Sequence, residues 1–162
     1  MKNQKGMTLF IAVVIMSILL FISFAVVNIT LKGILFASSG RDSQYAFYAA
    51  DAGLECAQYW DSKFNSFATS TSGSPINCGS MSIYNGQAIP GGATVMIGGG
   101  LYANATSTLY FDMNQGSNPM PYCVIVTVAK NTNGTTYIKS KGYNTCDTSN
   151  LRRVERGVEM TY

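Results

Sequence analysis

The clearest pattern along the chain is an apolar run close to its start. No charged residue occurs between Met7 and Leu31. The stretch 7–27 is interrupted by the polar residues Thr8, Ser17 and Ser23. About 20 apolar residues are enough to cross the hydrocarbon core of a bilayer, so the run predicts a membrane-spanning helix. Lys2 and Lys5 precede it. Because positive charge stays on the cytoplasmic side, the rest of the chain is expected across the membrane.

A second helical pattern follows the apolar run and is amphipathic. The segment from Tyr45 to Trp60 is rich in alanine and lacks proline. Residues spaced by three and four are predicted to form one apolar face: Tyr45, Tyr48, Ala49, Ala52, Cys56, Tyr59, Trp60, Phe64 and Phe67. The other face is expected to collect Asp51, Glu55, Gln58 and Asp61. A continuous helix from Thr8 to Phe64 would be roughly 85 Å long. A domain of this size cannot bury such a length, so its first half is expected in lipid or among partner helices.

The C-terminal part of the chain has the alternation of a β-sheet. Tyr122 to Ala129 is rich in β-branched residues, a turn signal follows at Asn131–Gly134, and Thr135 to Gly142 alternates again. The segment Leu151–Tyr162 is predicted to be a last strand, with Val154, Val158, Met160 and Tyr162 on one face. The stretch 68–100 has a loop composition. The predicted fold class is therefore α+β, a long N-terminal helix packed on a C-terminal antiparallel sheet.

Composition argues against catalysis and against nucleic-acid binding. The chain has no histidine, the commonest general base and metal ligand, and its eight carboxylates are scattered along the sequence. A net charge of +3 is too small for a nucleic-acid surface. The glycine run 98–100 lacks the lysine of a phosphate-binding loop. We therefore expect no catalytic residues, no metal and no cofactor, and a protein that is not an enzyme.

Four cysteines are present, and their spacing indicates disulfides. Cys56, Cys78, Cys123 and Cys146 form no CxxC motif, and without histidine they are a poor zinc site. In an exported chain an even count favours two disulfides and an oxidising compartment. Three pairings are possible, and four separate buried thiols are the alternative. We favour Cys56–Cys78 with Cys123–Cys146, because each closes a local loop that would stabilise the fold by roughly 3 kcal/mol.

The start of the apolar run allows three interpretations. One is a secretory signal peptide cut after Ala25, at Ser23-Phe24-Ala25, and another is an uncut single-pass anchor. The third begins from the step at Gly6-Met7, where a short basic segment meets a fully apolar helix. This junction is similar to the class III leader of type IV prepilins. The resemblance implies that a prepilin peptidase cleaves between Gly6 and Met7 and then N-methylates Met7.

A second resemblance lies farther along the helix. The segment Ala49–Glu55, AADAGLE, resembles the AAEAGLE-type segment of PilX-type minor pilins, and the ending at 138–162 is similar to the last strands of pilin-like proteins. The resemblance covers 1–67 and, loosely, 122–162. It implies a leader at 1–6, a helix at 7–67 whose part 7–27 lies in the membrane or filament core, and a β-rich head at 68–162.

The same resemblance implies a structural role in filament assembly. The expected partners are other pilin subunits, the prepilin peptidase, the pilus assembly machinery and the inner membrane, with a final location in an extracellular pilus or a periplasmic pseudopilus. Most pilins carry glutamate at the fifth mature position, where this chain has Ile11. The tip pseudopilins of type II secretion also lack it, which favours a minor or tip-associated subunit. The rival is a membrane-anchored or secreted binding or enzymatic domain, with a concave site within 68–121.

Overall fold

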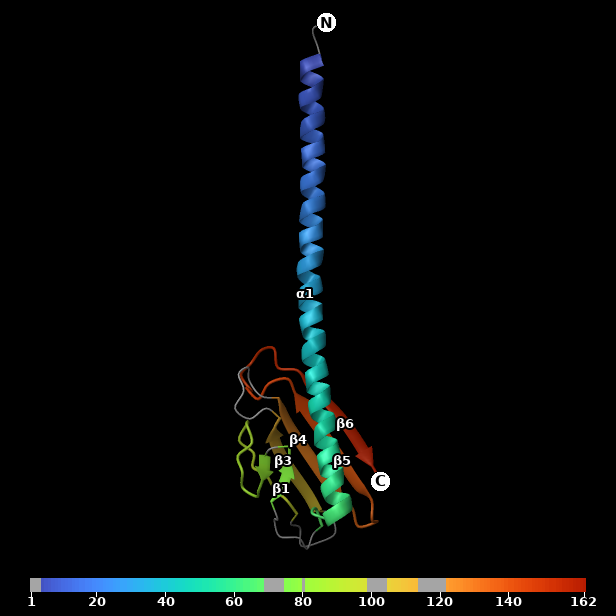
Figure 1. Ribbon diagram of the computed structural model, residues 1–162, viewed down its shortest axis with the longest axis vertical. Coiled ribbons are helices and arrows are strands. Elements are labelled where there is room, and N and C mark those ends of the chain that lie inside the picture. Colours follow the sequence, from blue (N-terminus) through green and yellow to red (C-terminus); the bar gives the residue numbers. More distant parts are fainter. Residues whose placement is uncertain (1–3, 69–74, 80, 99–104, 114–121) are drawn as a thin grey trace. The chain divides into compact units, whose positions relative to one another are not determined.

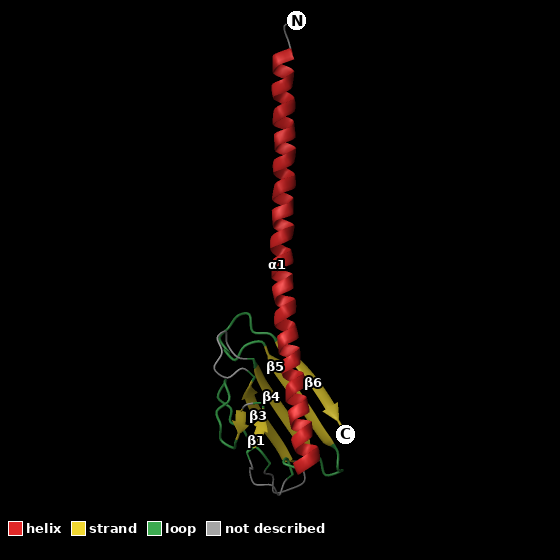
Figure 2. Ribbon diagram, in the orientation of Figure 1, coloured by secondary structure: helices red, strands yellow, loops and turns green. Residues whose placement is uncertain are grey.

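The computed structural model describes residues 4–68, 75–79, 81–98, 105–113 and 122–162 (Figure 1). The elements in chain order are α1 (Gln4–Phe64), β1 (Ile76–Cys78), β2 (Met81–Ile83), β3 (Ala105–Asp112), β4 (Cys123–Lys130), β5 (Thr136–Tyr143) and β6 (Glu155–Thr161). The chain forms two units, residues 1–40 and 41–162. The expected α+β layout is confirmed, and Figure 2 shows one helix together with strands and loops.

The head is built on an antiparallel sheet of order β3-β4-β5-β6. The strands β4, β5 and β6 lie where their alternation predicts them, within a few residues at each end. Gly134, with φ of 85°, takes the left-handed conformation in the β4–β5 connection, as the predicted turn requires. The strand β3 and the small hairpin β1-β2 were not predicted, because their segments lie in or beside stretches with loop composition.

One face of the sheet is apolar and supplies the centre of the core. Val124, Val126 and Val128 alternate along β4 and are completely buried. They stand in register with buried residues of both neighbouring strands, Phe111, Leu109 and Ser107 on β3 and Gly142, Ser140 and Ile138 on β5. Alternation with period two therefore gives the sheet a continuous face on which a helix can pack.

The head part of α1 lies on this face through small residues. Ala46, Ala49, Ala50, Gly53 and Ala57 are buried at helical spacings of three and four. A Cβ atom at Gly53 would collide with the side chains of Val124 and Ser140. A Cβ atom at Gly142 would collide with the helix backbone at Ala46 and Ala50. The helix and the sheet thus approach to a distance that only glycine permits at these two points.

The predicted apolar face of α1 was wrong for most of its aromatic members. Tyr48, Tyr59 and Phe64 are more than half exposed, and Tyr45 is also exposed. Asp61, assigned to the polar face, is instead buried. Side-chain size explains the difference, because the close contact with the sheet admits alanine and glycine and excludes the large rings. The sheet-facing stripe is therefore rotated away from the one that hydrophobicity alone predicts.

The helix ends at Phe64, and a left-handed residue completes it. Asn65 has φ of 48°, and its backbone N–H donates to the Asp61 carbonyl at 2.9 Å. This is the common αL termination, in which asparagine is one of the few residues to replace glycine at low cost. The turn directs the following chain toward Phe67, which is completely buried.

We predict that Gly142→Ala destabilises the head. The added methyl group overlaps the helix backbone, and such overpacking costs about 1–3 kcal/mol or more. Urea unfolding followed by the fluorescence of Trp60, the single tryptophan, measures the change. The matched control is Gly157→Ala on the adjacent strand β6, where the Cβ would lie 3.8 Å from the Ser140 carbonyl oxygen, an ordinary contact. Equal stability of the two variants would contradict the close packing described here.

Candidate functional site

The apolar part of α1 offers its side chains to the surroundings. Between Met7 and Phe36 the large apolar side chains have exposed fractions from 39% to 77%. In the described part of the chain, the one helix long and apolar enough to cross a membrane is the stretch Met7–Phe64. Exposed apolar surface on this scale marks a segment that contacts lipid or other proteins. This part of α1 is therefore the first candidate functional surface.

Four hydroxyl side chains between residues 17 and 38 are turned back onto their own helix. Each donates to a backbone carbonyl three or four residues earlier, at 2.8–2.9 Å: Ser17 to Val14, Ser23 to Leu19, Thr30 to Val26 and Ser38 to Leu35. An unsatisfied polar group costs several kcal/mol in hydrocarbon. Local bonding of these four hydroxyls removes that cost, so the surface suits an apolar environment.

The residues of the predicted processing site lie at the start of α1. Gly6 and Met7 both fall within its bounds, and the Met7 side chain is exposed. Ile11 is also about half exposed on the same helix. Lys2 lies outside the described residues. The structure thus places the predicted cleavage site next to the apolar surface, and cleavage and methylation themselves stay predictions.

The four cysteines form two disulfides in the favoured pairing. Cys56–Cys78 joins α1 to β1 with a Cα–Cα distance of 5.8 Å. Cys123–Cys146 joins the start of β4 to the loop before β6 with a Cα–Cα distance of 5.2 Å. Both distances lie within the usual range for disulfides. The first disulfide fixes the end of α1 to β1. A hydrogen bond joins the same two elements, because the Trp60 indole N–H donates to the Asn77 carbonyl at 2.9 Å.

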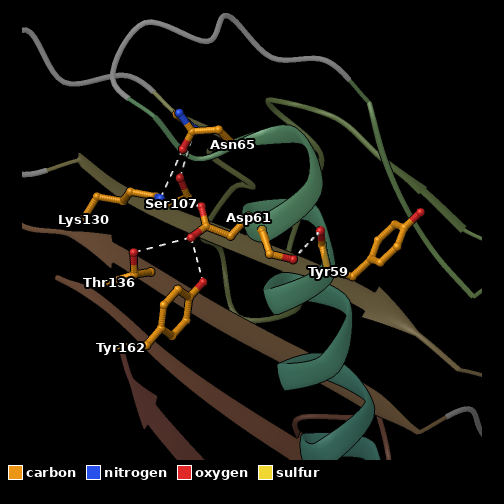
Figure 3. A network of polar contacts seen from close by, with 9 residues as sticks. Tyr59, Asp61, Asn65, Ser107, Lys130, Thr136 and Tyr162 are labelled. Carbon is orange, nitrogen blue, oxygen red and sulfur yellow. Dashed lines mark hydrogen bonds and ion pairs between the residues drawn. The ribbon is translucent and has the colours of Figure 1, made fainter. Parts of the chain in front are cut away.

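A buried carboxylate is the centre of a polar cluster in the head (Figure 3). Asp61 points from α1 toward the sheet, where Lys130 Nζ lies 2.7 Å from its Oδ1. Its Oδ2 accepts hydrogen bonds from the Tyr162 hydroxyl at 2.7 Å and from the Thr136 hydroxyl at 3.4 Å. Lys130 also donates to Asn65 Oδ1 at 3.2 Å. The cluster therefore connects the last turn of α1 to the end of β4, the start of β5 and the residue after β6.

The Asp61 cluster is structural rather than catalytic in character. Its carboxylate is satisfied by one cation and two hydroxyls, which is what a buried charge needs to be tolerated. Burial, together with the hydrogen bond to Asp61, raises the pKa of the Tyr162 phenol, so the phenol stays protonated as a donor. Sequence reasoning missed the cluster, although Asp61 follows Ala57 by four residues and so continues the small-residue stripe.

The chain matches no protein-family model, no curated protein and no solved structure. Within the described ranges no group of three or more potential metal ligands occurs. The concave site that the rival hypothesis expects in 68–121 falls in part on residues outside the described ranges. The geometry therefore establishes an exposed apolar helix and a cross-linked α+β head, a layout compatible with a pilin-like fold.

We predict that Tyr162→Phe lowers the stability of the head at pH 8 by about 1.5 kcal/mol, because a hydrogen bond to a charged group is lost. The difference in stability between the wild type and Tyr162→Phe should shrink above pH 10. There the unfolded chain releases the phenolic proton while the folded chain retains it, so the wild type loses stability as pH rises toward the raised folded pKa. Urea unfolding at several pH values measures both effects.

Tyr84→Phe is the control for this experiment, since Tyr84 is an exposed tyrosine outside the Asp61 cluster. Tyr84→Phe should leave the stability of the head unchanged at every pH measured. A constant difference between Tyr162→Phe and the wild type from pH 8 to pH 11 would show that the phenol does not titrate differently in the folded state.

Proposed function

We propose that this chain is a structural subunit of a type IV pilus or a related pseudopilus, minor or tip-associated within it. The observation that carries the proposal is the exposed apolar part of α1 in one chain with a cross-linked α+β head. The Gly6-Met7 junction and the AADAGLE segment support it from the sequence. The fold by itself serves many functions, so the proposal rests on this combination.

In the proposed mechanism the helix has two successive environments. Before assembly the segment 7–27 lies in the inner membrane, where its apolar side chains face lipid. During assembly it packs against the helices of other subunits, and the head remains outside this bundle. Lipid and protein interiors are similarly apolar, so packing and shape, rather than the hydrophobic effect, would drive the exchange. A separate motor would supply the energy for extension.

The head is stabilised by features that suit the compartment in which the proposal places it. Its two disulfides suit the oxidising space beyond the inner membrane. The AADAGLE segment supports the same proposal, because its small residues Ala49, Ala50 and Gly53 make the close contact between helix and sheet.

The rival function is a membrane-anchored or secreted binding or enzymatic domain with an ordinary signal sequence. An apolar helix near the N-terminus is also what a signal sequence or a plain anchor provides. The mature N-terminus separates the three possibilities. It is Met7 for a pilin, Val26 for a cleaved signal peptide and Met1 for an uncut anchor.

We predict that Gly6→Leu blocks processing, because the resemblance assigns Gly6 to the position before the cut. N-terminal sequencing of the wild type should give N-methylated Met7, and the variant should accumulate in the inner membrane with its first six residues. Gly33→Leu is the matched control, since a side chain at Gly33 meets nothing within 4 Å, and it should be cleaved normally. A wild-type N-terminus at Val26 would refute the pilin proposal.

We also predict a low copy number in filaments. With Ile11 at the fifth mature position, a subunit offers no carboxylate to the N-terminal amine of a neighbour. An unpaired charge in an apolar core costs about 3 kcal/mol, and a homopolymer would repeat that cost at every subunit. Quantitative mass spectrometry of sheared filaments should find this chain far below a major pilin that carries the glutamate. Filaments composed mainly of this chain would refute the minor or tip assignment and leave the pilin assignment intact.

A further inference from the structure

The outward face of α1 within the head carries an acidic and aromatic stripe. Tyr48, Asp51, Glu55 and Tyr59 follow one another at helical spacings of three and four, so they share a face. Both tyrosines are more than half exposed, at 65% and 53%. Neither carboxylate takes part in an ion pair with any described residue. The stripe, residues 48–59, thus offers two unpaired negative charges between two rings.

A second surface of the same head has the opposite charge and an exposed apolar side chain on a braced loop. The loop before β6 is braced by side-chain bonds: Asp147 Oδ1 accepts from the Ser149 N–H at 2.9 Å and Asn150 Oδ1 accepts from the Arg152 N–H at 2.8 Å. Asn144 fixes the loop's end by accepting from the Val154 N–H at 2.7 Å. This braced loop leaves Leu151 fully exposed. A braced loop backbone loses less conformational entropy on binding than a flexible one.

The charge of this second surface comes from Arg152, which follows Leu151 in the chain, and from Arg41 of α1. Arg41 of α1 and Arg152 of the loop line one cavity of about 530 Å³, with Asp42 and the stacked rings of Tyr45 and Tyr122. Neither guanidinium forms an ion pair within the described ranges. The cavity therefore keeps one net positive charge even with Asp42 counted. Arg41, Leu151, Arg152 and this cavity together form the basic surface.

We propose that the basic surface of one copy binds the 48–59 stripe of a second copy. Arg41 and Arg152 would pair with Asp51 and Glu55, and Leu151 would pack against the tyrosines. The proposal rests on the proposed function and names a contact between neighbouring subunits. Charge complementarity between two surfaces of one chain selects a second copy as the occupant, because each surface leaves unpaired what the other supplies.

Residue spacing along α1 sets the displacement that a parallel second copy would need. Arg41 lies ten residues before Asp51 and fourteen before Glu55 on α1. At 1.5 Å per residue, a second copy displaced by roughly 15–21 Å along the helix axis would bring the charges together. Because the two surfaces differ, the contact is heterologous, and such a contact continues as a helical assembly unless it closes into a ring. Two adjacent copies are enough to form it, so the inference rests on the minor assignment, in which copies can be neighbours, and not on a single subunit at the tip.

A charge exchange tests the proposal in cells that make the full-length chain. Each variant carries a photocrosslinking residue at Leu151, and the readout is the crosslinked dimer. The wild-type background should give a dimer whose crosslinked peptide contains residues 48–59. Arg152→Glu or Glu55→Arg alone should reduce the dimer at least tenfold, and Arg152→Glu with Glu55→Arg should restore most of it. Lys63→Glu is the control, a charge reversal at an exposed residue outside both surfaces, and should change nothing.

The outcomes separate this inference from the proposed function. Loss in the single variants with recovery in the exchange supports the contact. Unchanged dimer in the single variants, loss without recovery, or a crosslink to another protein overturns it. The free energy of unfolding of each variant is measured alongside. If both single variants are unfolded to an extent that explains the loss of crosslinked dimer, the proposal is also overturned. Absence of the wild-type chain from sheared filaments would instead refute the proposed function, whatever the crosslink shows.

Discussion

The close contact between α1 and the sheet is the constraint on which the rest of the head depends. At Gly142 the helix backbone occupies the space where any other residue would place its Cβ atom. This fixes which helix residues can face the sheet, and they are small. The large aromatic residues of the same segment are then left on the outside, where Tyr48 and Tyr59 remain exposed. One steric condition thus determines both the inner and the outer surface of the helix.

The other stabilising features act on the same helix end. Cys56–Cys78 links it to β1, and Asp61 links it to the sheet through Lys130 and Tyr162. A helix within a protein gains most of its stability from tertiary contacts. Here those contacts are of three kinds, covalent, ionic and steric, within about four turns of the helix. Each limits sliding of the helix along the sheet in a different way, and together they leave one position for it.

Sequence reasoning recovered the elements with strong periodicity. The apolar run, the strands β4 to β6 and both disulfides follow from local patterns. The face of the helix was predicted wrongly, because hydrophobic spacing does not encode how close two elements approach. The strand β3 was missed because its alternation, in ATSTLYFD, begins with small and polar residues that also suit a loop. Asp61 was placed outside because a charge is rarely buried unless partners distant in the sequence reach it.

The locally bonded hydroxyls of the apolar segment have a mechanical consequence. Ser17, Ser23, Thr30 and Ser38 already use their protons within the helix. These four side chains therefore have no bond to a partner helix that must break when the helix rotates or slides against an apolar neighbour. Transfer of the helix from one apolar environment to another would leave the number of hydrogen bonds made by these four side chains unchanged.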